Sequence, residues 1–316
     1  MQNLLTVATQ VGILFALMGV GALCRRCRLV DESAVKGIVN ILILIVTPCL
    51  IVDVFQQPFD TSMMHGFVWA IIVAFLAHTI LVVTARLFAF GDDNSRPVLR
   101  LAIVFSNAGF MGIPLEQAIL GAKGVFYGAV YIVMFNIFIW SWGLCEMRRK
   151  NDCGSSHGLK WKELRPMIVN PGTIGIAAGL PLFLLSTTLP SIVRTPVSLM
   201  AALNTPLAMI VIGFYLAGAD FRRVVRTPCA YVAAAIRLIA FPLAMIALLF
   251  PFRSHFPREM MLAIVIAASA PVAAMVSMFA AKFGRDVDLS VGLVSGTTLL
   301  SILTMPPVIV LAMGVL

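Results

Sequence analysis

Charged residues are scarce in this sequence. Asp, Glu, Lys and Arg make up 12% of the 316 residues, whereas ordinary soluble domains carry about 25%. Apolar residues make up 60%, and the mean hydropathy is +1.01. So few charges leave too little polar surface to cover a globule in water. The composition excludes a soluble enzyme, a disordered chain and a disulfide-stapled secreted module, and it indicates a protein whose solvent is the lipid bilayer.

Long polar connectors are also lacking. A spanning helix needs about 20 mostly apolar residues, and ten such windows, numbered here as spans one to ten, cover residues 4–24, 35–55, 65–88, 98–120, 124–146, 167–186, 197–218, 229–250, 259–281 and 289–314. Their apolar runs are continuous rather than alternating, which argues against a transmembrane β-barrel. We therefore predict one all-α polytopic membrane domain, with five helices in 1–147, a cytoplasmic basic loop at 148–164 and five helices in 165–316.

Basic residues are distributed unevenly between the connectors. If the chain crosses ten times, 18 of the 23 Lys and Arg fall on one side and only Lys123, Arg194, Arg253 and Arg258 on the other. Cytoplasmic loops carry the excess of Lys and Arg, so both termini are expected outside the cell membrane. The net charge of +9 is explained by topology, and nothing indicates nucleic-acid binding.

Sequence motifs for catalysis, metal binding and nucleotide binding are absent. There is no GxxxxGK[ST] phosphate loop, no HExxH element and no pair of mid-membrane aspartates. Cys24 and Cys27 form a lone CxxC without a second pair or spaced histidines, so we interpret the cysteines as reduced thiols. We predict no catalytic residue, no metal and no cofactor.

Short internal matches indicate a duplication. Thr47-Pro48 in span two recurs as Thr205-Pro206 in span seven, at an offset of 158. The segment 101–104 in span four recurs at 262–265 in span nine, at an offset of 161. A five-span unit changes orientation when it is duplicated, so the two halves are expected to be inverted repeats.

Helix-breaking residues occur at corresponding places in spans four and nine. Span four contains Asn107, Gly109 and Pro114, and span nine contains Ser269-Ala-Pro271. In hydrocarbon, the backbone groups freed by such residues are tolerated only inside protein or beside a cavity. Interrupted helices in two inverted halves indicate a transporter's binding site. We therefore place a substrate between these two segments.

These motifs resemble the auxin efflux carrier family over essentially the whole chain. The most specific element is Asn107-Ala-Gly-Phe-Met-Gly-Ile-Pro114, and bacterial members of the family are malate, malonate or general organic-acid permeases. The resemblance implies that spans four and nine unwind and cross, and that spans one, two, six and seven form a scaffold that dimerises. It also implies roles for Asn107 and Pro114 at the first crossing, Pro271 at the second and Asn136 at the substrate. Span three differs from that of plant members in its ionisable residues, because only His78 lies between its ends. The resemblance therefore implies no coupling ion.

Few ionisable side chains lie deep in the predicted spans. Arg237 lies near the middle of span eight and His78 near that of span three, and their separation of 159 matches the repeat offsets. Asp53 and Glu116 lie towards the outer ends of spans two and four. One fixed cation without a mid-membrane carboxylate favours an anionic substrate. Two alternatives stay open for each central residue: Arg237 binds the anion or braces backbone carbonyls, and His78 carries a proton or donates an interhelical hydrogen bond.

We therefore predict a secondary transporter of small organic anions in the cell membrane, with His78, Asp53 and Glu116 as possible coupling residues. A passive anion channel on the same fold is the alternative. Counterflow and accumulation against a gradient distinguish the two, because a channel shows neither. An intramembrane enzyme is disfavoured because its catalytic constellations are missing from the sequence.

Overall fold

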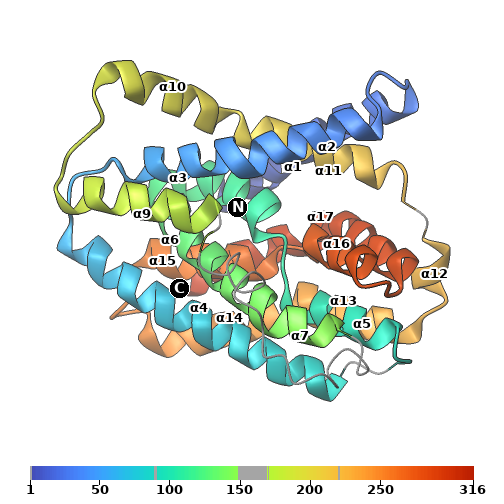
Figure 1. The fold of residues 1–316 in the computed structure, drawn as a ribbon. Coiled ribbons are helices and arrows are strands. Elements are labelled where there is room, and N and C mark those ends of the chain that lie inside the picture. The colour runs from blue at the N-terminus through green and yellow to red at the C-terminus, as the bar shows by residue number, and fades with distance from the viewer. Residues whose placement is uncertain (1, 89–90, 149–168, 170, 220) are drawn as a thin grey trace, which may run out of the picture.

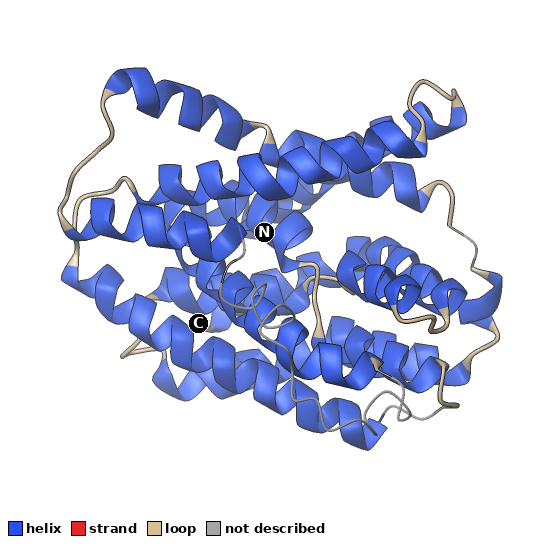
Figure 2. Ribbon diagram, in the orientation of Figure 1, coloured by secondary structure: helices blue, strands red, loops and turns tan. Residues whose placement is uncertain are grey.

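The structure is a computed structural model, and it describes residues 2–88, 91–148, 169, 171–219 and 221–316. Every regular element in these ranges is a helix (Figures 1 and 2), as the composition predicts. Most of the predicted basic loop at 148–164 lies outside the described residues.

The first half of the chain follows the predicted ranges closely. Its α-helices are α1 (Gln2–Arg26), α2 (Glu32–Ile41), α3 (Thr47–Phe55), α4 (Thr61–Phe88), α5 (Ser95–Val104), α6 (Ile113–Phe138) and α7 (Leu144–Met147). Wider π-helical turns join some of them, namely η1 (Leu42–Val46), η2 (Ala108–Gly112) and η3 (Ile139–Gly143). α2 begins where the Asp31 carboxylate accepts the Ala34 N–H at 2.7 Å, the usual role of an N-cap aspartate.

The second half contains a similar series of helices. They are α9 (Pro171–Leu184), α10 (Ser191–Ala202), α11 (Asn204–Leu216), α12 (Arg222–Val225), α13 (Pro228–Ala235), η5 (Ile236–Ala240), α14 (Phe241–Leu249), η6 (Phe250–Phe252), α15 (Arg258–Ser269), α16 (Ala274–Lys282) and α17 (Val287–Val315). Asp286 caps α17 by accepting the Leu289 N–H at 3.0 Å.

Six helical stretches of the described chain are long and apolar enough to cross a membrane. They are Glu32–Phe55, Thr61–Phe88, Ala108–Met147, Ser191–Leu216, Pro228–Phe252 and Val287–Val315. The remaining predicted spans correspond to α1, to the 14-residue α9 and to the interrupted pairs α5–η2 and α15–α16.

The helices form two groups (Figure 1). α1, α2, α3, α9, α10 and α11 pack mainly on one another, and in the figure they occupy its upper part. The second group consists of α4 to α7 and α12 to α17, with α6 and α15 in close contact at its centre. One buried apolar cluster includes Phe105, Tyr131 and Ile264, and the other joins Met18 and Phe214 of the first group to Met111 of the second.

α6 reverses direction at Gly121. This residue has φ 66° and ψ −152°, a conformation that glycine adopts readily because it has no Cβ. The Glu116 carboxylate touches the Gly128 backbone across the reversal, whereas in a straight helix the two would lie about 18 Å apart. The first leg (113–120) and the second leg (122–138) therefore form a hairpin, at the boundary predicted between spans four and five.

Three π-helical turns end two residues before a proline. η1 precedes Pro48, η2 precedes Pro114 and η5 precedes Pro242. Proline has no N–H to donate to the preceding turn, and a π-turn accommodates one extra residue in the helix. The structure therefore widens the helix before each of these prolines. Gly109 and Arg237 both lie in such turns.

Glycines allow the helices of the first group to approach closely. A Cβ at Gly175 or Gly179 of α9 would lie 3.0 Å from the Ile51 Cβ or 2.8 Å from the Phe55 Cβ of α3. A Cβ at Gly213 of α11 would overlap the Met18 carbonyl of α1. The contact between α1 and α11 therefore depends on hydrogen-sized side chains.

We expect Gly213→Ala to destabilise the protein by about 1–3 kcal/mol, because the new methyl group must push α1 and α11 apart. Thermal unfolding of the purified protein in detergent measures this loss. Gly19→Ala is the matched control, since no atom lies within 4 Å of a Cβ at that position of α1. Equal melting temperatures for the two variants would contradict the described packing.

Candidate functional site

The two predicted helix breaks lie side by side. α5 ends at Val104 and η2 begins at Ala108, while α15 ends at Ser269 and α16 begins at Ala274. Ser106 and Val272 form an antiparallel β-bridge between the two extended connections. The Asn107 N–H donates to the Pro271 carbonyl at 2.6 Å, and the Ala273 N–H donates to the Phe105 carbonyl at 2.9 Å. The structure thus brings Asn107 and Pro271, predicted from separate halves of the chain, into direct contact.

A side chain from α17 completes this bridge. The Val272 N–H donates to the Thr297 hydroxyl at 3.1 Å, and Thr297 in turn donates to the Leu293 carbonyl at 2.7 Å. Buried backbone groups need such partners where no water is available. The sequence analysis did not identify Thr297, because a threonine in an apolar helix carries no signal of a partner far along the chain.

Arg237 lies where both interrupted helices end. Its side chain is fully buried, and one terminal nitrogen donates to the Ile103 and Val104 carbonyls at 3.2 Å each. The other terminal nitrogen donates to the Ala268 carbonyl of α15. Carbonyls at helix C-termini carry partial negative charge and favour a cation. Of the two roles predicted for Arg237, the geometry favours a brace that joins the ends of α5 and α15.

Aromatic and titratable side chains surround this guanidinium. The central carbon of the Arg237 guanidinium lies 5.1 Å from the centroid of the Phe241 ring. The Tyr131 hydroxyl is near enough to interact with the guanidinium electrostatically. Tyr131 also packs against His78, with ring centroids 4.7 Å apart. The Nδ1 of His78 lies 2.8 Å from the Ala74 carbonyl of its own helix, so this contact is intrahelical and is not the predicted interhelical hydrogen bond. Arg237 and His78 therefore lie in one neighbourhood, and Tyr131 is a member that the sequence analysis missed.

Several polar atoms in this region have no hydrogen-bond partner among the described residues. They are the His78 Nε2 and the Ser106 hydroxyl, together with the Tyr131 hydroxyl and the Arg237 Nε, whose side chains interact with each other. Buried polar atoms are seldom left without a partner unless water, an ion or a ligand supplies one. The bridge region therefore has unused capacity to bind a polar group.

Gly109 and Asn136 approach one another through Ile132. A Cβ at Gly109 would meet only the Ile132 Cδ1, at 4.0 Å, so the π-turn borders open space there. The Asn136 amide donates to the Ile132 carbonyl at 2.8 Å, and its side chain is half-buried. Asn107 is 6% exposed and precedes the same π-turn. Asn107 and Gly109 therefore lie just before the first leg of the hairpin, and Asn136 lies on its second leg.

Two predicted site residues have structural roles within their own helices. The Ser269 hydroxyl donates to the Ile266 carbonyl at 2.9 Å and is fully buried. Pro114 is buried in the first turn of α6, where a missing N–H costs little.

The acidic candidates lie apart from one another. Asp53 of α3 accepts a hydrogen bond from Ser198 of α10, so it joins two helices of the first group. Glu116 lies on the first leg of α6, is fully buried, and has no hydrogen-bond partner for either carboxylate oxygen in the described ranges. No group of three His, Cys, Asp or Glu side chains that could hold a metal occurs among the residues searched.

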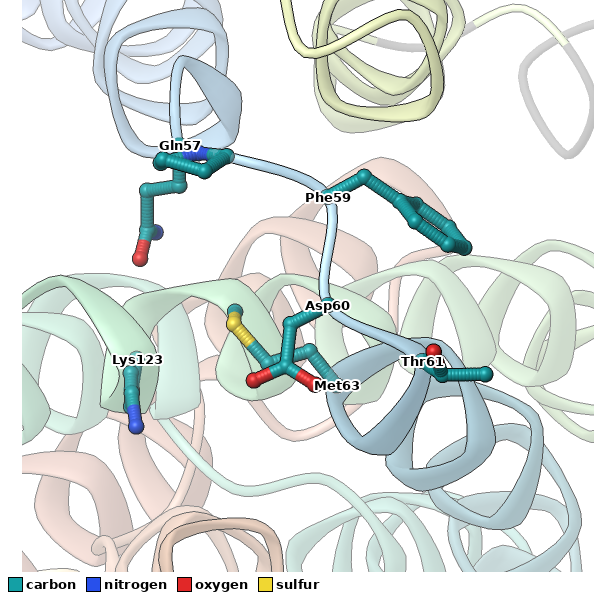
Figure 3. A pocket seen from close by; sticks show the side chains of 7 residues that line it. Gln57, Phe59, Asp60, Thr61, Met63 and Lys123 are labelled. Atoms are coloured by element: carbon teal, nitrogen blue, oxygen red, sulfur yellow. The ribbon is translucent and has the colours of Figure 1, made fainter.

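A cavity of about 500 Å³ has none of the bridge residues in its lining (Figure 3). It is lined by Gln57, Pro58, Phe59, Asp60, Thr61, Met63 and Lys123. Lys123 also lies 3.8 Å from the Glu259 carboxylate. The cavity contains none of the predicted substrate residues, so we do not assign the site to it.

An apolar cavity of about 280 Å³ lies between helices of the two groups. It lies between α4, α6 and α9, and its lining residues are Phe67, Ile71, Val130, Val133, Met134, Thr173, Ile176, Ala177 and Leu180. The cavity lies at the boundary between the groups, where the rings of Phe55, Phe67 and Phe126 also pack against one another.

Comparison with known families gave one match. The family model described as "Membrane transport protein" matches residues 6–309. No curated protein matches the sequence significantly.

We expect Arg237→Gln to destabilise the protein by about 3 kcal/mol, because carbonyls at the ends of α5 and α15 lose a charged donor. Thermal unfolding in detergent measures the change. Arg253→Gln, at an exposed position in the connector that follows predicted span eight, is the control. Wild-type stability of Arg237→Gln would contradict the bracing role and return Arg237 to direct anion binding.

Proposed function

The chain belongs to the membrane transport protein family, the auxin efflux carrier family, and from this premise we propose that it is a secondary-active transporter of small organic anions. The family and the apolar helices make it an integral multi-pass membrane transport protein. The observation that carries the narrower proposal is the bridged pair of helix breaks with a buried arginine at their ends.

We propose that the substrate lies beside the bridge. The helical segments that leave it begin at Ala108 and Ala274, and the first N–H groups of a helix favour negative charge. Asn107 supplies an amide that makes no side-chain hydrogen bond to the described residues, and Gly109 keeps the adjacent space open. Asn136 borders the same space, while Pro114, Ser269 and Pro271 fix the shape of the two breaks.

Charge supports an anion rather than a cation. Arg237 has no carboxylate partner in the part of the chain that the structure describes, so its charge is balanced by carbonyl dipoles, the Phe241 ring and the Tyr131 hydroxyl. A bound carboxylate would supply negative charge to Arg237, either at a distance or by accepting a hydrogen bond from the Arg237 Nε. Malate, malonate and auxin-like acids are therefore suitable in charge and in size.

The proposed layout is ten spans in two inverted five-helix repeats. The hairpin reversal at Gly121 separates spans four and five, and the two breaks occupy corresponding places in the two halves. Their antiparallel bridge is the arrangement expected of halves related by an axis in the membrane plane. Both termini face outside in this proposal, the loop at 148–164 is cytoplasmic, and the membrane is the cell membrane.

We propose that the two groups of helices move against each other to give alternating access. The first group, which contains predicted spans one, two, six and seven, is the scaffold, and its exposed apolar side chains face lipid and a second copy of the chain. The apolar cavity between α4, α6 and α9 lies at this boundary.

We expect small carboxylates to raise the melting temperature of the purified protein and Asn107→Ala to reduce that shift. A ligand at 100 times its Kd adds about 2.7 kcal/mol to stability, and tenfold weaker binding removes about 1.4 kcal/mol of it. Asn40→Ala, on the exposed face of α2, is the control and should behave as wild type. An undiminished shift in a folded Asn107→Ala protein would move the site away from the bridge.

A further inference from the structure

Glu116 is a buried acid without a partner. Its side chain is fully buried, and both carboxylate oxygens lack hydrogen bonds within the described chain. It lies nine residues after Asn107 and five before the reversal at Gly121. An ionised carboxylate in such a place loses its hydration and gains nothing in return, which costs several kcal/mol or more.

Two glycines make room for this carboxyl group. A Cβ at Gly128, on the second leg of α6, would overlap the Glu116 Oε2. A Cβ at Gly112, the last residue of η2, would lie 3.7 Å from the Oε1 and 3.6 Å from the Ala267 Cα of α15. The carboxyl therefore touches the backbone of the π-turn that borders the proposed substrate site.

No charged side chain of the described residues forms an ion pair with Glu116. None of the titratable groups on its own helix or on the elements packed against that helix makes a hydrogen bond to the Glu116 carboxyl oxygens in the described chain. On α6 and α15 they are Lys123, Tyr127, Tyr131, Arg258 and Glu259; on α1 and α11, Cys24, Arg25, Arg26 and Tyr215; on α3 and α4, Cys49, Asp53, His65, His78 and Arg86. Lys123 pairs with Glu259, Arg258 donates to the Met313 carbonyl, and Arg237 donates to the helix ends. The carboxyl group is left with a proton as its only available counter-charge.

We propose that Glu116 binds one proton, and that this proton is transported together with the organic anion. The proposal rests on the anion transport proposed above. The carboxylate takes up a proton from water at the membrane face nearest Gly121 and becomes a neutral acid, which the buried position tolerates. On the other face the same O–H bond breaks, and the proton returns to water.

Proximity couples the two ligands. In a medium of low dielectric constant, an ionised Glu116 beside η2 would repel an anion bound near Gly109. Protonation removes this repulsion, so the anion binds better when the proton is bound, and the proton binds better when the anion is bound. Because each ligand favours the other, anion and proton cross the membrane in the same direction.

The test compares anion binding at two pH values in the wild type and in Glu116→Gln, whose amide mimics the neutral acid. Binding of malate, malonate and lactate is measured by calorimetry at about pH 5.5 and about pH 8, both above the ordinary range of exposed carboxyl groups near 4.3. In the wild type we expect affinity to fall by about tenfold at the higher pH. In Glu116→Gln this fall should be absent, apart from any change that comes from ionisation of the ligand. Ionisation of the ligand itself affects both proteins equally.

Glu259→Gln is the matched control, because Glu259 is partly exposed and lies near Lys123. It should retain the wild-type dependence on pH. The same dependence in wild type and Glu116→Gln would overturn the proton proposal while leaving anion transport intact.

Infrared spectroscopy tests the proton site without any ligand. At about pH 7, where exposed carboxyl groups are ionised, the wild type should show a neutral-acid carbonyl band that Glu116→Gln lacks. Absence of this difference overturns the proposal. Presence of the band in a protein that binds none of the three anions would support the proton site and refute the proposed substrate class.

Discussion

The structure depends on one constraint, which is that backbone polar groups inside a membrane must find partners within the protein. Breaking α5 and α15 frees carbonyls and N–H groups at the centre of the helical assembly. The bridge between Ser106 and Val272, the Thr297 hydroxyl and the Arg237 guanidinium pair many of these groups. Neither break could persist alone, because each supplies partners for the other. The same pairing leaves helix N-termini and the Asn107 amide available for a ligand.

Much of the helical layout can be read from the sequence. Apolar runs locate the helices, the helix-breaking residues of spans four and nine locate both breaks, and Arg237 is the one basic residue left when the connectors are assigned. The GxxxG spacing of Gly175 and Gly179 is also visible, and in the structure both residues touch α3. These features can be read from the sequence because they are local. Hydrophobic periodicity, composition and the missing N–H of proline each act within a few residues.

The partners of the central side chains could not be read in this way. Arg237 bonds to carbonyls 31 to 134 residues away, and Thr297 to a backbone N–H 25 residues away. Nothing in the spacing of these residues distinguishes an arginine that binds substrate from one that braces helix ends. The contact of Glu116 with Gly128 likewise depends on the reversal at Gly121. Tertiary packing decides each of these roles.

The central claim is that the bridged breaks form the site of an anion carrier, and counterflow tests it most directly. Proteoliposomes loaded with unlabelled malonate and diluted into a trace of labelled malonate should accumulate the label transiently. Asn107→Ala, reconstituted at equal amount and folded, should show little or no accumulation. A wild-type protein that equilibrates the label without accumulating it would be a channel. Counterflow undiminished in Asn107→Ala would contradict the placement of the site at the bridge.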